Sequence, residues 1–143
     1  MLSNYVVNKI IDMIYRDRDW SPPADLYVGL YTAAPTDAGG GTEVTGGSYA
    51  RVLHGPSDTT WKATQGGTPA AASNGTSRTT SNAGVITFPA PTANWGVVVA
   101  MGVFDASSGG NLIHWSPLTI SKTINNGDPA PTFQDGAAGI TAV

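Results

Sequence analysis

The chain has 143 residues, no cysteine, a net charge of −3 and only 12% charged residues. This length is that of a single domain, 1–143, which can bury a core without disulfides. Seven Lys and Arg side chains are too few for a clustered basic surface, so we expect no nucleic-acid partner. No apolar run is long enough to cross a bilayer, so we expect no membrane partner either.

The first predicted element is a helix over 4–17. Its apolar residues recur every three or four positions and form one stripe, which includes Val7 and Ile11. Ser3 or Asn4 can cap the start, and acidic residues followed by two prolines end the helix. The charges in and after this helix exclude a secretory signal, so we expect the chain to fold in a cytoplasm. The stripe either covers an open end of a β core or packs on a neighbouring subunit.

Residues 24–143 favour short β-strands, because Val, Ile, Tyr, Phe and Thr suit a pleated surface and Gly- and Pro-rich turns separate the runs. We expect strands at 26–33, 48–54, 83–89, 95–104, 112–118, 120–124, 129–134 and 139–143. The 120–124 run either continues the preceding strand or begins another. The predicted fold is therefore mainly β: a jelly-roll-like β-sandwich of about eight short strands, with one N-terminal α-helix in residues 1–20.

A central hairpin comes from the apolar runs on both sides of residues 105–111, whose Asp, Ser, Gly and Asn favour turns. Gly96 and Gly102 in the first arm indicate a bulge or a close approach of backbone. Pro117 lacks an N–H donor, so it places the end of the second arm at a sheet edge or a strand terminus.

Two long segments have no strand pattern. Residues 34–47 form a Gly-rich loop, and a long loop in a compact domain is often a contact site. The low-complexity segment at about 63–82 is either a surface loop or an arm that becomes ordered only against a neighbour. A surface with so few charges is poorly protected against association, so we expect much of it to be covered in an assembly.

Groups for catalysis are sparse. His54 and His114 lie on distant predicted strands and cannot form a three-ligand zinc site without carboxylates. Glu43 is the single glutamate, whereas a glycosidase needs two carboxylates on rigid walls. Asp105 lies in a turn, where one carboxylate is weak support for Ca²⁺. We therefore predict no catalytic residue, no metal site, no cofactor and no enzymatic activity.

The aromatic side chains allow two interpretations. Tyr31, Tyr49 and Trp61 carry large rings that fill cores or anchor interfaces. The same rings could stack on sugars. The first interpretation predicts a structural role and the second predicts a binding module.

Several segments in combination resemble one known protein family. They are 26–37 (Leu-Tyr-Val-Gly-Leu-Tyr-Thr-Ala-Ala-Pro-Thr-Asp), 40–51, 85–89, 95–96, 102–112 and 126–128. The family consists of small virion proteins of tailed phages, usually labelled tail fibre proteins, and some members are similar to capsid decoration or cement proteins. The resemblance covers 26–128, with a gap at about 57–80. The family has no catalytic residue to transfer to this chain.

The resemblance implies a non-enzymatic structural protein of a tailed-phage virion, assembled in the host bacterial cytoplasm. We expect a capsid decoration or cement protein that forms homo-oligomers, for example trimers, and binds the major capsid protein. The alternative is a tail fibre or tail adaptor subunit that binds tail proteins. A host-surface carbohydrate- or receptor-binding module is the alternative of another class. The expected interface residues are Val7, Ile11, Tyr31, Glu43, Tyr49, Arg51, Trp61, Asp105 and Asn111.

Overall fold

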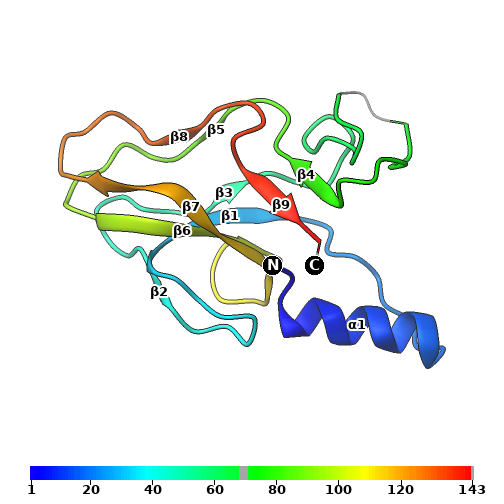
Figure 1. Cartoon of the computed structure of the whole chain (residues 1–143). Coiled ribbons are helices and arrows are strands. Elements are labelled where there is room, and N and C mark those ends of the chain that lie inside the picture. Colours follow the sequence, from blue (N-terminus) through cyan, green and yellow to red (C-terminus); the bar gives the residue numbers. More distant parts are fainter. Residues whose placement is uncertain (68–70, 143) are drawn as a thin grey trace.

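A computed structural model describes residues 1–67 and 71–142. The elements follow the order α1 (Asn4–Tyr15), β1 (Tyr27–Ala33), β2 (Thr42–Glu43), β3 (Val52–Leu53), β4 (Thr79–Ser81), β5 (Ile86–Thr87), β6 (Gly96–Phe104), β7 (Leu112–Ile124), β8 (Thr132–Phe133) and β9 (Gly139–Thr141). Over these residues the chain is mainly β with an N-terminal α-helix, which confirms the predicted fold class (Figure 1). Within them, no helix is long and apolar enough to span a membrane.

The largest sheet is antiparallel and has the strand order β2–β1–β6–β7, with β3 also paired to β1. Strand β1 lies at its centre, and β6 with β7 forms the predicted central hairpin. The predicted runs 112–118 and 120–124 are a single strand, because β7 continues through Pro117 to Ile124. Pro117 is tolerated there since β7 is at the edge of the sheet, where a missing N–H donor costs little.

A second layer covers one face of this sheet. Strands β5 and β8 pair with each other, and Figure 1 shows them above β6 and β1. Apolar side chains of both layers meet between them, among them Leu30 and Met101 of the large sheet and Ile86 and Phe88 of the β5 segment. Two packed layers around an apolar core fit the predicted β-sandwich.

The segment 63–82 folds back on itself. The Thr64 hydroxyl accepts a hydrogen bond from the backbone N–H of Gly75 at 2.9 Å, and the Gln65 side-chain oxygen accepts one from Asn74 at 3.0 Å. The segment ends in β4, which pairs with β9. Residues 68–70 of this segment, and Val143 of the predicted strand 139–143, lie outside the described residues.

Several predicted elements have different bounds in the structure. The segment 34–47 is not structureless, because it contains β2, which pairs with β1. The predicted strand 48–54 is reduced to β3, since Ser48 has a positive φ of 65° and turns the chain. The predicted strands 83–89 and 129–134 are reduced to β5 and β8, because nearby prolines withhold N–H donors from longer ladders.

Helix α1 starts as predicted and ends earlier than predicted. The Ser3 hydroxyl accepts a hydrogen bond from the backbone N–H of Val6 at 3.4 Å, which caps the first turn. Asp17 has a positive φ of 52°, so the chain leaves the helix before it reaches the prolines. The backbone N–H of Arg18 then donates to the Asp12 carbonyl at 3.1 Å and closes this end.

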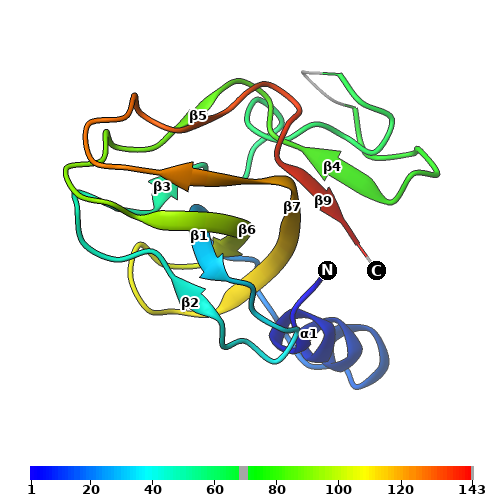
Figure 2. The same cartoon turned by 60° about the vertical axis from the view of Figure 1, so that its left-hand side comes forward.

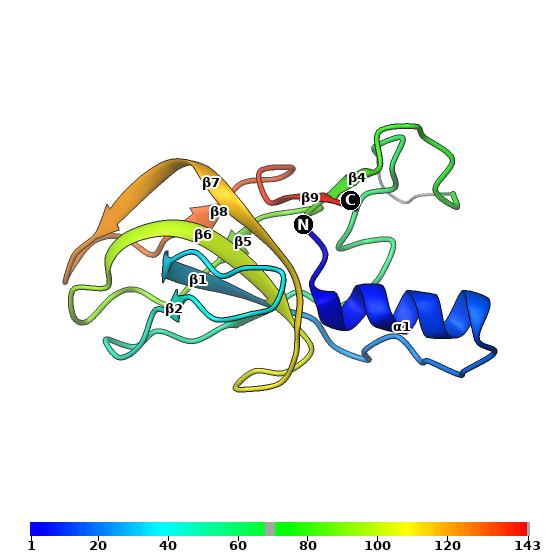
Figure 3. The same ribbon diagram turned by 60° about the horizontal axis from the view of Figure 1, so that its bottom comes forward.

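Most of the apolar face of α1 is exposed. Within the helix only Val6 is buried, whereas Val7, Ile11 and Ile14 are 38%, 43% and 60% exposed. Figure 3 shows the helix extending away from the strands, with its first turn nearest to them. Burial of the stripe is therefore limited to Val6, which is buried, and Ile10, which is half-buried.

Candidate functional site

A polar cluster covers the face of the large sheet that points away from the core. On this face Gly29 of β1 pairs with Gly102 of β6. A Cβ atom at Gly29 would lie 2.9 Å from the Tyr49 hydroxyl, and one at Gly102 would lie 2.8 Å from the Tyr31 ring. The two glycines therefore let neighbouring side chains lie close to the sheet, and at Gly102 the predicted close approach is confirmed.

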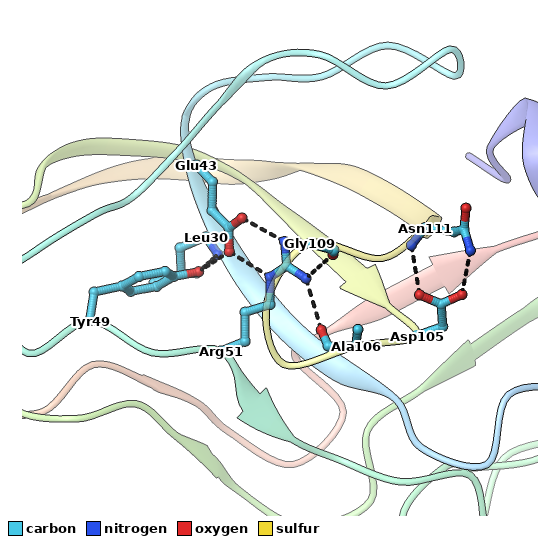
Figure 4. A network of polar contacts seen from close by, with 8 residues as sticks. All are labelled: Leu30, Glu43, Tyr49, Arg51, Asp105, Ala106, Gly109 and Asn111. Atoms are coloured by element: carbon cyan, nitrogen blue, oxygen red, sulfur yellow. Dashed lines mark hydrogen bonds and ion pairs between the residues drawn. The ribbon is translucent and has the colours of Figure 1, made fainter.

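Arg51 joins β2 to the turn after β6 (Figure 4). Its Nε and Nη2 atoms donate to the two carboxylate oxygens of Glu43, both at 2.7 Å, and Nη1 donates to the carbonyls of Ala106 and Gly109, both at 2.8 Å. The guanidinium carbon lies 3.3 Å from the centroid of the Phe104 ring. We call this set of contacts the guanidinium clamp; it fixes two loops with one side chain that is 7% exposed.

Tyr49 connects the guanidinium clamp to the core. Its hydroxyl donates to Glu43 Oε1 at 2.9 Å and accepts from the backbone N–H of Leu30 at 2.8 Å. Its ring packs edge-on against Trp95, with ring centroids 5.3 Å apart. Burial, with the negative charge of Glu43 beside it, raises the pKa of Tyr49 well above its usual range, so the phenol keeps its proton.

Asp105 and Asn111 close the turn between β6 and β7. Asp105 Oδ1 accepts from the Asn111 backbone N–H at 2.6 Å, and Oδ2 accepts from the Asn111 side-chain amide at 2.7 Å (Figure 4). Both carboxylate oxygens are thus engaged within the turn, as its Asx-type composition predicts. In the part of the chain that the structure describes, no three His, Asp or Glu side chains lie close enough to hold a metal ion.

A groove of about 440 Å³ lies beside the guanidinium clamp. It runs between the start of α1, the glycine-rich turn 37–41 and residues 109–112. The backbone N–H of Asn4 donates to the Asp37 carbonyl at 2.7 Å, which holds the turn against the helix (Figure 2). Tyr31, which is 5% exposed, lines this groove.

The structure brings most of the predicted interface residues together at this cluster. They are Tyr31, Glu43, Tyr49, Arg51, Asp105 and Asn111. Val7 and Ile11 lie apart from it on α1. Trp61 also lies apart, because its ring packs edge-on against His54 and its Nε1 donates to the His54 carbonyl at 3.2 Å. The role of all nine as interface residues stays a prediction.

Sequence reasoning missed Asp37, which lines the groove, and Asn82, a buried residue that follows β4 away from the groove. Asn82 is fully buried: its Nδ2 donates to the carbonyls of Gly84 at 2.6 Å and Gln134 at 2.9 Å, and its Oδ1 accepts from the Ala138 N–H at 2.8 Å. It stands in a Ser- and Thr-rich run with no periodic pattern, so nothing local distinguishes it. Asp37 has the composition of an ordinary turn residue.

The two histidines are part of the packed structure. His54 Nε2 lies 2.7 Å from the Thr60 carbonyl, and His114 of β7 is 1% exposed. Burial lowers the pKa of His114 to about 4, with the nearby Met1 amino group adding to the effect, so the ring is neutral at neutral pH. His114 therefore lies within the sheet as a buried, neutral residue.

The match to a known protein family covers both the helix and the strands. A model of the family described as "Podophage GP4 fiber I protein gp80" matches residues 1–141. No curated protein matches the chain.

Proposed function

The chain belongs to the podophage GP4 fiber I protein gp80 family, and from this premise we propose that it is a tail fibre subunit of a tailed phage. The family description names a fibre, which makes the protein a phage structural component and favours the tail over the capsid decoration or cement role that the sequence suggested first. A subunit of this kind needs no catalytic group, which fits the sparse supply of such groups, so we propose a non-enzymatic protein.

The exposed apolar face of α1 indicates how such a subunit associates with other copies of the chain. Val7, Ile11 and Ile14 follow each other at helical spacing and form a stripe that a second helix can cover. A monomeric protein rarely exposes a contiguous apolar stripe without a binding role. We propose that the stripe packs on the same stripe of neighbouring copies and so forms a homo-oligomer.

The polar cluster serves this assembly by fixing the loops around it. The guanidinium clamp ties the turn after β6 to β2, and the Asp105–Asn111 contacts close that turn. Ordered loops lose little entropy when a partner covers them, so they are suited to contact other tail proteins. In this proposal α1 joins copies of the chain and the loops join the oligomer to the virion.

A cryo-EM map of purified particles, with the subunit located by its fold, tests the placement. Density at the tail or its vertex supports the fibre proposal. Density on the capsid lattice would instead establish the decoration role, and absence from the particle would overturn both placements.

Two matched variants test the role of α1. Sedimentation of the wild type at increasing protein concentration should show a growing share of oligomer, and an Ile11→Asp, Ile14→Asp variant should stay monomeric over the same range. Ile120→Asp is the control, because Ile120 is 81% exposed and lies on β7, away from α1. A monomeric wild type, or equal effects of the two variants, would contradict the proposed use of the stripe.

A further inference from the structure

We propose that neighbouring copies of the chain exchange their N-terminal segments, so that residues 1–15 of one copy dock on β7 of the next. The inference rests on the homo-oligomer proposed above and adds the way in which its copies are joined. In the structure the segment docks on its own β7, which we call the closed arrangement. Exchange of an identical element between copies costs little, because each contact of the closed arrangement is made again on the neighbour.

The contact between the segment and β7 is short and is made through the backbone. The N–H of Ser3 donates to the Ile113 carbonyl, and the N–H of Trp115 donates to the Met1 carbonyl, both at 3.0 Å. Ser3 is 2% exposed, so the contact is also well covered. Because β7 is an edge strand, any copy presents the same row of backbone groups to a segment that arrives from a neighbour.

Beyond its first turns, α1 makes little use of its own domain. Within the helix Val6 is buried and Ile10 is half-buried, whereas the later residues of the stripe are exposed. Figure 3 shows the helix extending away from the strands, with the chain returning along it towards β1. The closed arrangement therefore leaves apolar surface uncovered that a second domain, brought next to the helix by exchange, can cover.

The linker between α1 and β1, residues 16–26, is long enough to reach a neighbour. A fully extended chain of this length spans up to roughly 36–40 Å. The 12-residue helix beside it is about 18 Å long, so the linker has slack when it returns to its own β1. Most of the linker is exposed, and Pro22 and Pro23 favour extended backbone over a compact turn.

The turn at the start of the linker is strained in the closed arrangement. Asp17 has a positive φ of 52°, which brings its Cβ close to the following carbonyl oxygen. This turn sends the linker back to its own β1. A segment that docks on a neighbour does not need the turn, so exchange lets Asp17 return to an ordinary φ. In dilute solution the closed arrangement still dominates, because the β7 of the same copy is always at high effective concentration.

Isotope-filtered NMR of a mixed sample provides the test. Equal amounts of ¹³C,¹⁵N-labelled and unlabelled full chain are unfolded together in urea and refolded together at millimolar concentration. Leu2 lies opposite His114 in an antiparallel pair that is flanked by hydrogen bonds, and the Cα atoms of such a pair are about 4.5 Å apart. Their Hα protons therefore give a strong nuclear Overhauser signal. We expect this signal between labelled and unlabelled copies.

Two matched linker variants test the contribution of the strained turn. Asp17→Gly removes the steric cost of the positive φ, so it should lower the ratio of exchanged to closed copies about fivefold or more. Asp19→Gly makes the same chemical change two residues further along the linker, where φ is not positive, and should leave this ratio unchanged.

The possible results distinguish the exchange from the homo-oligomer on which it rests. Signals between the α1 helices of different copies, without a Leu2–His114 signal between copies, would overturn the exchange and leave the homo-oligomer in place. A sample that sediments as a monomer at this concentration would overturn both. Equal effects of the two linker variants would overturn the part that the strained turn plays in the exchange.

Discussion

Replacing Arg51 by methionine should destabilise the protein, and the guanidinium clamp lets the effect be estimated. The substitution removes two hydrogen bonds to Glu43 and two to loop carbonyls, and it leaves the Glu43 carboxylate without a counter-ion. Removing one partner of a buried pair costs about 3–5 kcal/mol. The Glu43 side chain is 24% exposed and can recover some hydration, so we expect a loss of about 2–4 kcal/mol. That is a large part of the roughly 5–15 kcal/mol by which a domain is stable.

A double-mutant cycle isolates the contact between the two charges. Glu43→Gln keeps an acceptor for Arg51, so it should cost less than Arg51→Met. The double variant contains no unpaired carboxylate, so its loss should be smaller than the sum of the two single losses by about 1–2 kcal/mol. Urea unfolding followed by tryptophan fluorescence, at one fixed protein concentration, gives all four free energies of unfolding.

A surface ion pair provides the control. Lys62 and Asp135 also lie 2.7 Å apart, but the Asp135 side chain is 56% exposed, so Lys62→Met should unfold at the same urea concentration as the wild type. The reasoning is refuted if Arg51→Met stays within about 0.5 kcal/mol of the wild type, or if the losses in the cycle are additive.

Two further predictions concern buried polar side chains. Asn82→Ala should cost about 2–4 kcal/mol in urea unfolding, since three buried hydrogen bonds are lost, and a cost below about 1 kcal/mol would contradict their role. His114 has a pKa of about 4 in the folded chain and an ordinary value near 6.5 when unfolded. The unfolded chain therefore takes up a proton first as the pH falls, and stability is lost between about pH 6.5 and pH 4. Between about pH 7.5 and pH 5 the wild type should lose more stability than His114→Gln, and equal losses would contradict the burial effect.

The parts of the fold that follow from local pattern were predictable from the sequence. The hairpin around 105–111 has long apolar arms and a turn composition, and both appear in the structure. The start of α1 follows from the ability of Ser3 to accept a backbone N–H, and the edge position of β7 follows from Pro117. In each case a few neighbouring residues determine the outcome.

The parts that depend on distant partners were not predictable. Strand β2 has two residues, and only its pairing with Tyr31 and Ala33 makes it a strand. Asn82 is defined by bonds to residues more than fifty positions away in the sequence, Gln134 and Ala138. The candidate site shows the same division: the Gly-rich loop and the turn were expected as separate contact regions, and the guanidinium clamp that joins them becomes visible only in three dimensions.

The energetics of the α1 stripe explain why it would act through many copies. The exposed parts of Val7, Ile11, Met13 and Ile14 together amount to about two whole side chains, worth about 3–6 kcal/mol for each copy when covered. Association costs about 4–15 kcal/mol, so a contact through this stripe alone is marginal for two free subunits. Once the loops anchor each subunit in a larger particle, the contact between neighbours becomes intramolecular and its cost falls. A weak stripe on a rigid domain can therefore give a stable assembly on the virion and a readily dissociated oligomer in dilute solution.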